Sequence, residues 1–225
     1  MNIYLNRKVP VISFITEKKA ELINNFIFGS MLEVGVGEGL FTNYLISFLK
    51  QKKINTLECC EYNKKQAINI SKKYKVKCYN TKIENLDINN KYDIILLSDI
   101  LEHVDDPIVV INKCKTFLRD SNSHIIIFTP NALSLNRLLG VEMGMLKDAY
   151  DFNVGDIKFN HNRWYDMDTL LDDVKQCSLK VEMYKEFFLK PLSNAMMKNY
   201  KKELLQALYN IGIENCAELM VVCHL

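Results

Sequence analysis

A glycine-rich turn after the first apolar run is the clearest candidate for chemistry. Gly35, Gly37 and Gly39 alternate with other residues, and Glu33 stands two positions before the first glycine. Glycine lets the backbone turn sharply and lets a ligand approach without meeting a side chain. Such turns lie at the carboxyl edge of a parallel sheet, where nucleotide-like ligands bind. The pattern predicts a nucleotide-type site, and a plain strand-to-helix turn is the alternative.

A second acid, Glu61, ends the next apolar run, roughly 20 residues after Gly39. A carboxylate at this distance can accept hydrogen bonds from ribose hydroxyls, as it does in dinucleotide-binding folds. Those folds carry GxGxxG, whereas this chain has GxGxG with an acid two residues ahead. An NAD-binding oxidoreductase is therefore the weaker interpretation, and no pair of residues suited to hydride chemistry is evident.

Four histidines could serve as a general base: His103, His124, His161 and His224. Histidine suits this role because its pKa lies near neutrality. His124 begins a predicted strand and His224 lies at the end of the chain, so both are poor candidates. We therefore predict His103 and His161 as catalytic residues, and a purely structural role is the alternative for each.

The hydrophobic pattern predicts the scaffold that holds these residues. We expect strands at residues 31–35, 56–60, 76–79, 94–97, 125–128, 180–187 and 217–224. We expect helices at 40–50, 64–74, 169–176 and about 200–209, and one that opens at Pro107. This order predicts a doubly wound, Rossmann-like α/β fold with a seven-stranded sheet. Five strands are parallel, two close the sheet as an antiparallel hairpin, and helices cover both faces beside a small cap.

Composition narrows the classes of function. The net charge is +2 and the lysines are scattered among acids, so a committed nucleic-acid binder is not expected. Seven cysteines without a CxxC pair indicate reduced core thiols rather than a zinc site. Because the sequence shows no signal peptide at its start and no long apolar span, we expect a cytoplasmic protein.

Two further motifs carry a family resemblance. They are YDIILLSDILEHV at residues 92–104 and FTPN at residues 128–131. With the glycine turn and Glu61, they resemble class I S-adenosylmethionine-dependent methyltransferases of the ubiquinone-biosynthesis O-methyltransferase-like type (methyltransferase type 11/12). The resemblance covers about residues 31–181. It implies an S-adenosylmethionine cofactor. The two histidines, the acidic cluster beside His103 and the lack of a basic patch favour methyl transfer to a hydroxyl of a small polar molecule over transfer to an amine.

The resemblance also implies where the cofactor binds. Glu33 and the backbone of the three glycines would hold the methionine part, and Ser98 would face its amino group. Glu61 would bind the ribose. The adenine would lie beside residues of two further segments, namely Tyr62, Lys82 and Ile83. Lys82 stands where the family often has an acid, so we expect a backbone contact from Ile83 in place of that side-chain contact.

A second likeness concerns a possible metal site. Asp99, Glu102, His103 and His161 resemble the metal-ligand set of small-RNA 2′-O-methyltransferases. Residues i, i+3 and i+4 of one helical turn share a face, so Asp99, Glu102 and His103 could bind one ion together. Oxygen-rich ligands suit Mg²⁺ or Mn²⁺. The alternative is that Glu102 and His103 only hold a loop in place.

The carboxyl-terminal part should select the acceptor. Residues 131–144 and 188–195 loosely resemble bacterial methyltransferases of surface-carbohydrate synthesis, which suggests a sugar, sugar nucleotide or polysaccharide precursor. Four basic residues could bind a phosphate or carboxylate of such an acceptor, or could be plain surface charges: Arg137, Lys147, Arg163 and Lys190. An RNA 2′-O-methyltransferase with a metal-assisted site and a non-catalytic cofactor-binding subunit are the alternatives.

The domain organisation follows from these patterns. We expect one methyltransferase domain over residues 1–225, with a helical lead-in at 1–28. We expect residues 132–165 and 187–215 to be insertions that cover the substrate. The sequence leaves the oligomeric state open.

Overall fold

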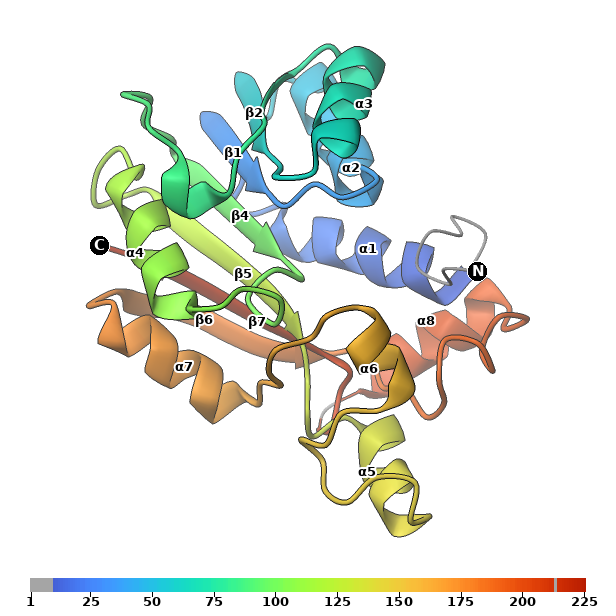
Figure 1. Ribbon diagram of the computed structural model, residues 1–225. Coiled ribbons are helices and arrows are strands. Elements are labelled where there is room, and N and C mark those ends of the chain that lie inside the picture. The colour runs from blue at the N-terminus through green and yellow to red at the C-terminus, as the bar shows by residue number, and fades with distance from the viewer. Residues whose placement is uncertain (1–9, 213) are drawn as a thin grey trace.

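The computed structural model describes residues 10–212 and 214–225. Its centre is a seven-stranded sheet in the order β3-β2-β1-β4-β5-β7-β6 (Figure 1). The strands are β1 (Ser30–Val34), β2 (Thr56–Cys60), β3 (Lys77–Tyr79), β4 (Ile94–Ser98), β5 (His124–Pro130), β6 (Lys180–Phe187) and β7 (Glu218–His224). β1 to β5 are parallel, and β7 runs antiparallel to both β5 and β6. The predicted fold class is confirmed.

Helices cover both faces of this sheet (Figure 1). They are α1 (Pro10–Ile23), α2 (Leu40–Lys50), α3 (Lys64–Tyr74), the 3₁₀ helix η2 (Ile83–Asn85), α4 (Pro107–Thr116), α5 (Leu135–Glu142), α6 (Val154–Lys158), α7 (Met167–Gln176) and α8 (Lys202–Ile211). Within the described part of the chain, no helix combines the length and the apolar character needed to span a bilayer.

Local chemistry explains where the central helices begin. α3 starts after Asn63, whose side chain accepts hydrogen bonds from the backbone N–H groups of Lys65 and Gln66. α4 starts with Pro107 after Asp106, whose carboxylate accepts the backbone N–H of Val109. Side-chain caps satisfy donors that the first helical turn leaves free, and proline fits that turn because it has no N–H to satisfy.

The hydrophobic core lies in two layers, one on each face of the sheet. Alternate β4 residues point to opposite faces, so Ile94 joins one layer and Ile95 the other. α1, α2 and α8 pack against the first layer, and α4 and α7 pack against the second. Most residues of β4 and β5 are buried, which explains the continuous apolar runs of these two strands.

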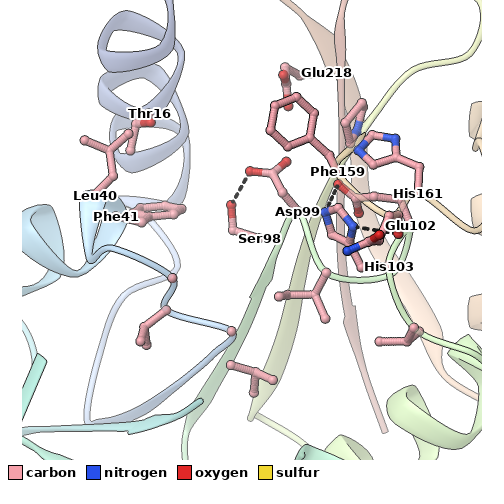
Figure 2. Close-up of a pocket in the computed structure, with 18 of the residues that line it drawn as sticks. Thr16, Leu40, Phe41, Ser98, Asp99, Glu102, His103, Phe159, His161 and Glu218 are labelled. Atoms are coloured by element: carbon pink, nitrogen blue, oxygen red, sulfur yellow. Dashed lines mark hydrogen bonds and ion pairs between the residues drawn. The ribbon is translucent and has the colours of Figure 1, made fainter. Parts of the chain in front are cut away.

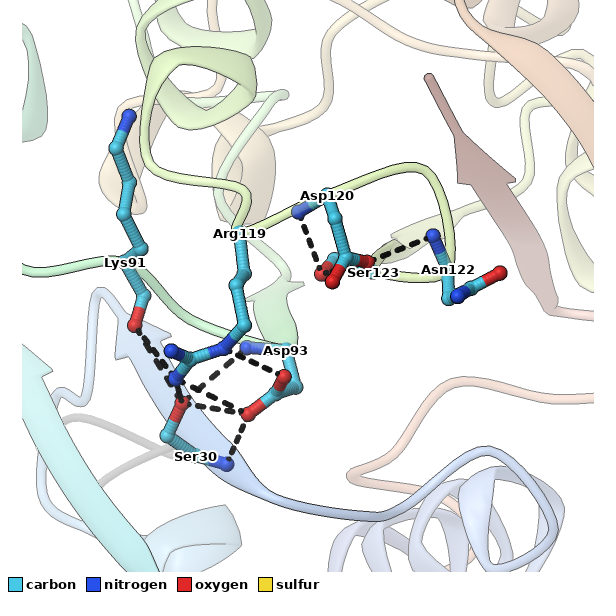
Figure 3. A network of polar contacts seen from close by, with 7 residues as sticks. All are labelled: Ser30, Lys91, Asp93, Arg119, Asp120, Asn122 and Ser123. Carbon is cyan, nitrogen blue, oxygen red and sulfur yellow. Dashed lines mark hydrogen bonds and ion pairs between the residues drawn. The ribbon is translucent and has the colours of Figure 1, made fainter.

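A polar network ties the amino ends of the central strands together (Figure 3). Asp93, just before β4, accepts hydrogen bonds from the Ser30 backbone N–H at 2.7 Å and from Arg119 Nε at 2.8 Å. Gly29 has φ +60°, and a Cβ there would lie 2.2 Å from the Asp93 carboxylate. This network fixes the register of β1 and β4 at the edge opposite the glycine turn.

Of the segments predicted to cover the substrate, the first holds two short helices near the carboxyl end of β5, and the second holds a helix beside α1 (Figure 1). α5 and α6 fall within residues 132–165, and α8 falls within 187–215. α1 lies inside the predicted lead-in, whose first nine residues are outside the described part of the chain. Coverage of a substrate by these segments stays a prediction.

Candidate active site

A cavity of about 780 Å³ opens at the carboxyl ends of the central strands. Its wall brings together residues predicted from distant parts of the sequence: Glu33, Gly35, Gly37, Glu61, Tyr62, Lys82, Ile83, Ser98, Asp99, Glu102, His103 and His161. Pockets of roughly 300–1,000 Å³ are typical of small-molecule and cofactor sites. The cavity is therefore large enough for a cofactor.

The glycine turn forms one wall of the cavity. Gly35 and Gly37 have φ of +72° and +51°, a region that favours glycine. A Cβ at Gly37 would meet no protein atom within 4 Å, so the backbone there is open to a ligand. Gly39 does not line the cavity, and a Cβ there would lie 2.4 Å from Ile70 Cδ1. The close approach of Ile70 in α3 therefore explains a glycine at position 39 by packing.

Glu61 fixes the turn from the end of β2. It is 3% exposed, and its carboxylate accepts the Gly37 N–H at 3.0 Å and the Asn63 N–H at 2.8 Å. Tyr62 beside it is largely exposed, as expected for a residue that would cover an adenine. Ile83 is buried in the same wall, while Lys82 Nζ lies 3.6 Å from Asp105 Oδ2.

Glu33 is buried in β1 at the base of the glycine turn. Burial raises the pKa of its carboxyl to about 8, and repulsion from Glu61 acts in the same direction. Its nearest polar neighbours include the Cys59 thiol, which donates at 3.9 Å. At neutral pH the raised pKa favours the protonated form of Glu33.

Glu102, His103 and His161 meet on the opposite wall (Figure 2). The two imidazole rings lie 4.8 Å apart, and one ligand atom from each of the three residues falls within 4.8 Å of the others. His103 Nδ1 lies 3.2 Å from the Asn160 carbonyl oxygen. Because a carbonyl only accepts, neutral His103 carries its proton on Nδ1 there, and the lone pair is on Nε2, which lies 3.9 Å from Glu102 Oε1.

His161 and Glu102 both sit in surroundings that disfavour charge. Burial, together with the nearby His103, lowers the pKa of His161 to about 4. Burial and the Asp99 charge raise the pKa of Glu102 well above its usual range. Glu102 also accepts a hydrogen bond from Thr129 Oγ1 at 3.2 Å. His161 is thus neutral at physiological pH, and Glu102 favours its protonated form.

Asp99 does not join this cluster, and the expected helical turn is wrong. Residues 99–105 form a loop, and Asp99 has φ +56°, so Asp99, Glu102 and His103 share no helical face. Instead the Asp99 carboxylate accepts two 2.7 Å hydrogen bonds from Lys19, and it also accepts one from Ser98 Oγ at 3.1 Å. Asp99 therefore binds a lysine ammonium and is not placed among the metal-like ligands.

Lys19 reaches this point from α1. Its ammonium lies 2.9 Å from Glu218 Oε2 at the start of β7, and its side chain is 4% exposed. Burial alone would lower the pKa of Lys19, but the Asp99 and Glu218 charges outweigh it and raise the pKa above its usual value. Sequence reasoning missed both residues. Glu218 could have been found because it is an acid at the start of an apolar strand. Lys19 could not, because its sequence context is that of any exposed lysine on a helix.

One known protein family matches most of this chain. A family model described as a methyltransferase domain matches residues 7–182. The chain belongs to that family. The expected enzyme class, an S-adenosylmethionine-dependent methyltransferase, is thereby confirmed, whereas the finer O-methyltransferase and carbohydrate types stay predictions. No curated protein matches the chain.

Solved structures share the fold of this methyltransferase at low sequence identity. An S-adenosylmethionine-dependent methyltransferase from Mesorhizobium loti has a TM-score of 0.65 at 13% identity, with 92% of this chain and 96% of that chain covered. The N-methyltransferase NodS from Bradyrhizobium japonicum WM9, in complex with S-adenosyl-L-homocysteine, has a TM-score of 0.58 at 12% identity, with 94% of this chain and 87% of that chain covered. The plantazolicin methyltransferase BamL, in complex with a triazolic desmethylPZN analogue and S-adenosylhomocysteine, has a TM-score of 0.64 at 17% identity, with 98% of this chain and 87% of that chain covered.

The basic residues of the methyltransferase that were considered as anion ligands lie in different places. Arg163 donates to the Leu101 carbonyl at 2.8 Å and so holds the loop after β4. Arg137 is buried, pairs with Asp156 at 3.2 Å and lies 3.7 Å above the Trp164 ring. Arg163 and Lys147 are not among the cavity-lining residues, whereas Lys190 is. The two arginines thus act as structural cations, and Lys190 remains as the candidate ligand.

Proposed function

We propose that this methyltransferase transfers a methyl group from S-adenosylmethionine to a hydroxyl of a small polar acceptor, with His103 as the general base. The observation that carries the proposal is the His103–His161 pair on the cavity wall (Figure 2). An alcohol must lose its proton as it is methylated, and a correctly positioned imidazole can accept that proton. A neutral amine can be methylated without such a base, so the pair favours a hydroxyl.

The residues of the opposite wall fit the cofactor. S-adenosylmethionine supplies an activated methyl group, so the protein mainly aligns donor and acceptor. The open backbone at Gly37 admits the ligand, and the fixed Glu61 carboxylate offers oxygens to ribose hydroxyls. Glu33 would bind the methionine part, and its buried carboxyl can ionise when an ammonium arrives.

His103 rather than His161 is assigned as the base. The Asn160 carbonyl holds the His103 proton on Nδ1, which leaves Nε2 free to accept a proton. His161 has its pKa lowered to about 4, so it is a weak base at neutral pH. We assign His161 to positioning, through its ring contact with His103 and a second ring contact with Trp164 at 5.3 Å.

The test is a methyl-transfer assay with labelled S-adenosylmethionine and a panel of sugars, sugar nucleotides and small alcohols. His103→Gln should lower kcat by about 10²-fold or more while S-adenosylhomocysteine affinity changes by less than about twofold. His161→Gln, the matched control, should cost no more than about tenfold. Equal losses for the two variants, or full activity in His103→Gln, would remove His103 as the base.

A metal-assisted reaction, such as 2′-O-methylation of RNA, is the second candidate. The observation that favours it is the approach of Glu102, His103 and His161 ligand atoms to within 4.8 Å of one another. Two imidazole nitrogens and one carboxylate could bind Mn²⁺ or Mg²⁺ against an acceptor diol. In this case a chelator should abolish activity and added metal should restore it, whereas full activity after chelation excludes this candidate.

A further inference from the structure

Several unpaired polar atoms gather on the cap side of the active-site cavity. Asn136 Oδ1, His161 Nδ1, Trp164 Nε1 and Asn194 Oδ1 are buried and have no hydrogen-bond partner among the described residues. All four side chains line the one cavity. A buried polar atom without a partner is costly, and native structures usually supply one from a bound water or ligand. The cluster therefore marks a place for a polar ligand.

Lys190 adds a positive charge to the same wall. Its backbone carbonyl accepts the Asn136 N–H at 3.0 Å, which brings the start of α5 to the segment before Asn194. Lys19 and Arg137 also line the cavity, but both are paired with carboxylates. Lys190 forms no ion pair with a described residue, and burial lowers its pKa although Glu218 and Asp156 oppose that shift. An anion on the ligand would compensate this charge.

A set of contacts around Arg137 holds the Trp164 ring in position. The Arg137 guanidinium stacks on Trp164 at 3.7 Å, donates to the Ala149 carbonyl at 2.8 Å and pairs with Asp156. Asp156 in turn accepts the Asn153 N–H at 2.9 Å and so closes the start of α6. The indole N–H is therefore held in place before any ligand binds, which reduces the entropic cost of binding.

We propose that Asn136, Trp164, Lys190 and Asn194 form the acceptor subsite, and that it binds a hydroxyl-rich molecule carrying one anionic group. This inference rests on the proposed function, because it names the acceptor of that same cavity. Hydroxyls both donate and accept, so they can satisfy the two amide oxygens and the indole N–H together. The anionic group, a phosphate or a carboxylate, pairs with Lys190. An apolar acceptor would leave every one of these atoms without a partner.

The experiment is calorimetric titration of the full chain with four probes, in the presence and absence of S-adenosylhomocysteine. Glucose 6-phosphate and glucuronate carry hydroxyls and an anion, glucose carries hydroxyls only, and propyl phosphate carries an anion only. One or both anionic hexoses should bind at least about tenfold more tightly than glucose and than propyl phosphate. The stronger of the two identifies the anion as phosphate or carboxylate.

Substitutions in the proposed subsite test whether the probes bind there. Lys190→Gln should weaken the anionic hexose by about tenfold and leave glucose unchanged, whereas Asn194→Ala should weaken all three sugars. Lys147→Gln and Asn122→Ala are matched controls at exposed positions outside the cavity, and neither should change any affinity. Thermal unfolding of each variant confirms that it is folded.

Two different failures can be told apart. If S-adenosylhomocysteine does not bind the folded protein, the proposed function is wrong, and the titrations without it still judge the subsite. The subsite itself is overturned if no hexose binds, if propyl phosphate binds as tightly as the anionic hexoses, or if Lys190→Gln and Asn194→Ala bind like the controls.

Discussion

The two sides of the cavity are built in different ways. The proposed cofactor side consists of backbone and short local segments, in which the Gly37 N–H meets Glu61 after the end of the adjacent strand. The proposed acceptor side consists of side chains from α1, the loop after β4, the cap and β7, as in the contact of Lys19 with Asp99 across 80 residues. A site made of backbone turns leaves a pattern in the sequence, whereas a site made of distant side chains does not.

The largest expected effect concerns the acceptor side. Lys19→Met removes the cation between Asp99 and Glu218, and a buried carboxylate left unpaired is strongly destabilising. We expect the free energy of unfolding to fall by about 3 kcal/mol at pH 7, measured by chemical denaturation. The loss should shrink at acidic pH, because burial already raises the pKa of Glu218 and protonation removes its charge.

Lys18→Met is the control for this change. Lys18 is the preceding residue, and its side chain is buried like that of Lys19, but its ion-pair partner Glu21 is half exposed. Because Glu21 stays hydrated when the lysine is removed, loss of this pair should cost about 1 kcal/mol or less. Equal losses for Lys18→Met and Lys19→Met would show that the acceptor side does not depend on its long-range pair.

The next effect should fall on the cofactor side alone. Glu61→Gln should weaken S-adenosylhomocysteine binding by about tenfold or more, because hydrogen bonds to a charged acceptor are worth more than neutral ones. Calorimetry measures the affinity. Glu58→Gln on the same strand is the control, since Glu58 binds the Tyr79 and Tyr92 hydroxyls outside the cavity. The comparison fails if Glu58→Gln weakens binding as much as Glu61→Gln.

The last prediction concerns how stability depends on pH. Glu33 has its pKa raised from 4.5 to about 8 in the folded state, so between these values the unfolded chain releases a proton that the folded chain keeps. Stability therefore falls as pH rises through this window, by up to about 1.4 kcal/mol per pH unit from this group. Glu33→Gln should flatten the curve of unfolding free energy between pH 5 and 8 by about that amount. Parallel curves for the two proteins would contradict the raised pKa.

Sequence patterns located most of the frame because their causes are local. β4 was predicted at 94–97 and is found at Ile94–Ser98, since a continuous apolar run is typical of a strand buried on both faces. α4 begins at Pro107 as predicted, because proline fits the first turn. The same local signals located Gly37 and Glu61, which the structure places together.

The failures come from contacts that join distant segments. Asp99 was expected to share a helical face with Glu102, but it adopts φ +56° and binds Lys19. Arg137 was considered as an anion ligand, yet it is buried against Asp156 and Trp164. Contacts between residues so far apart produce no periodic pattern in the sequence. The sequence therefore indicated which segments form the proposed acceptor side, but not which of their side chains contact one another.

The most direct test of the central claim is calorimetry with S-adenosylhomocysteine on the native protein, Gly37→Val and Gly144→Val. Both glycines have positive φ, and a Cβ at either would meet no atom within 4 Å, so the backbone strain is similar. Only Gly37 lines the cavity. We predict that the native protein binds and that Gly37→Val weakens binding by about a hundredfold, while Gly144→Val changes it by less than about twofold. No binding by the folded native protein, or equal losses in both variants, would contradict a cofactor site at the glycine turn.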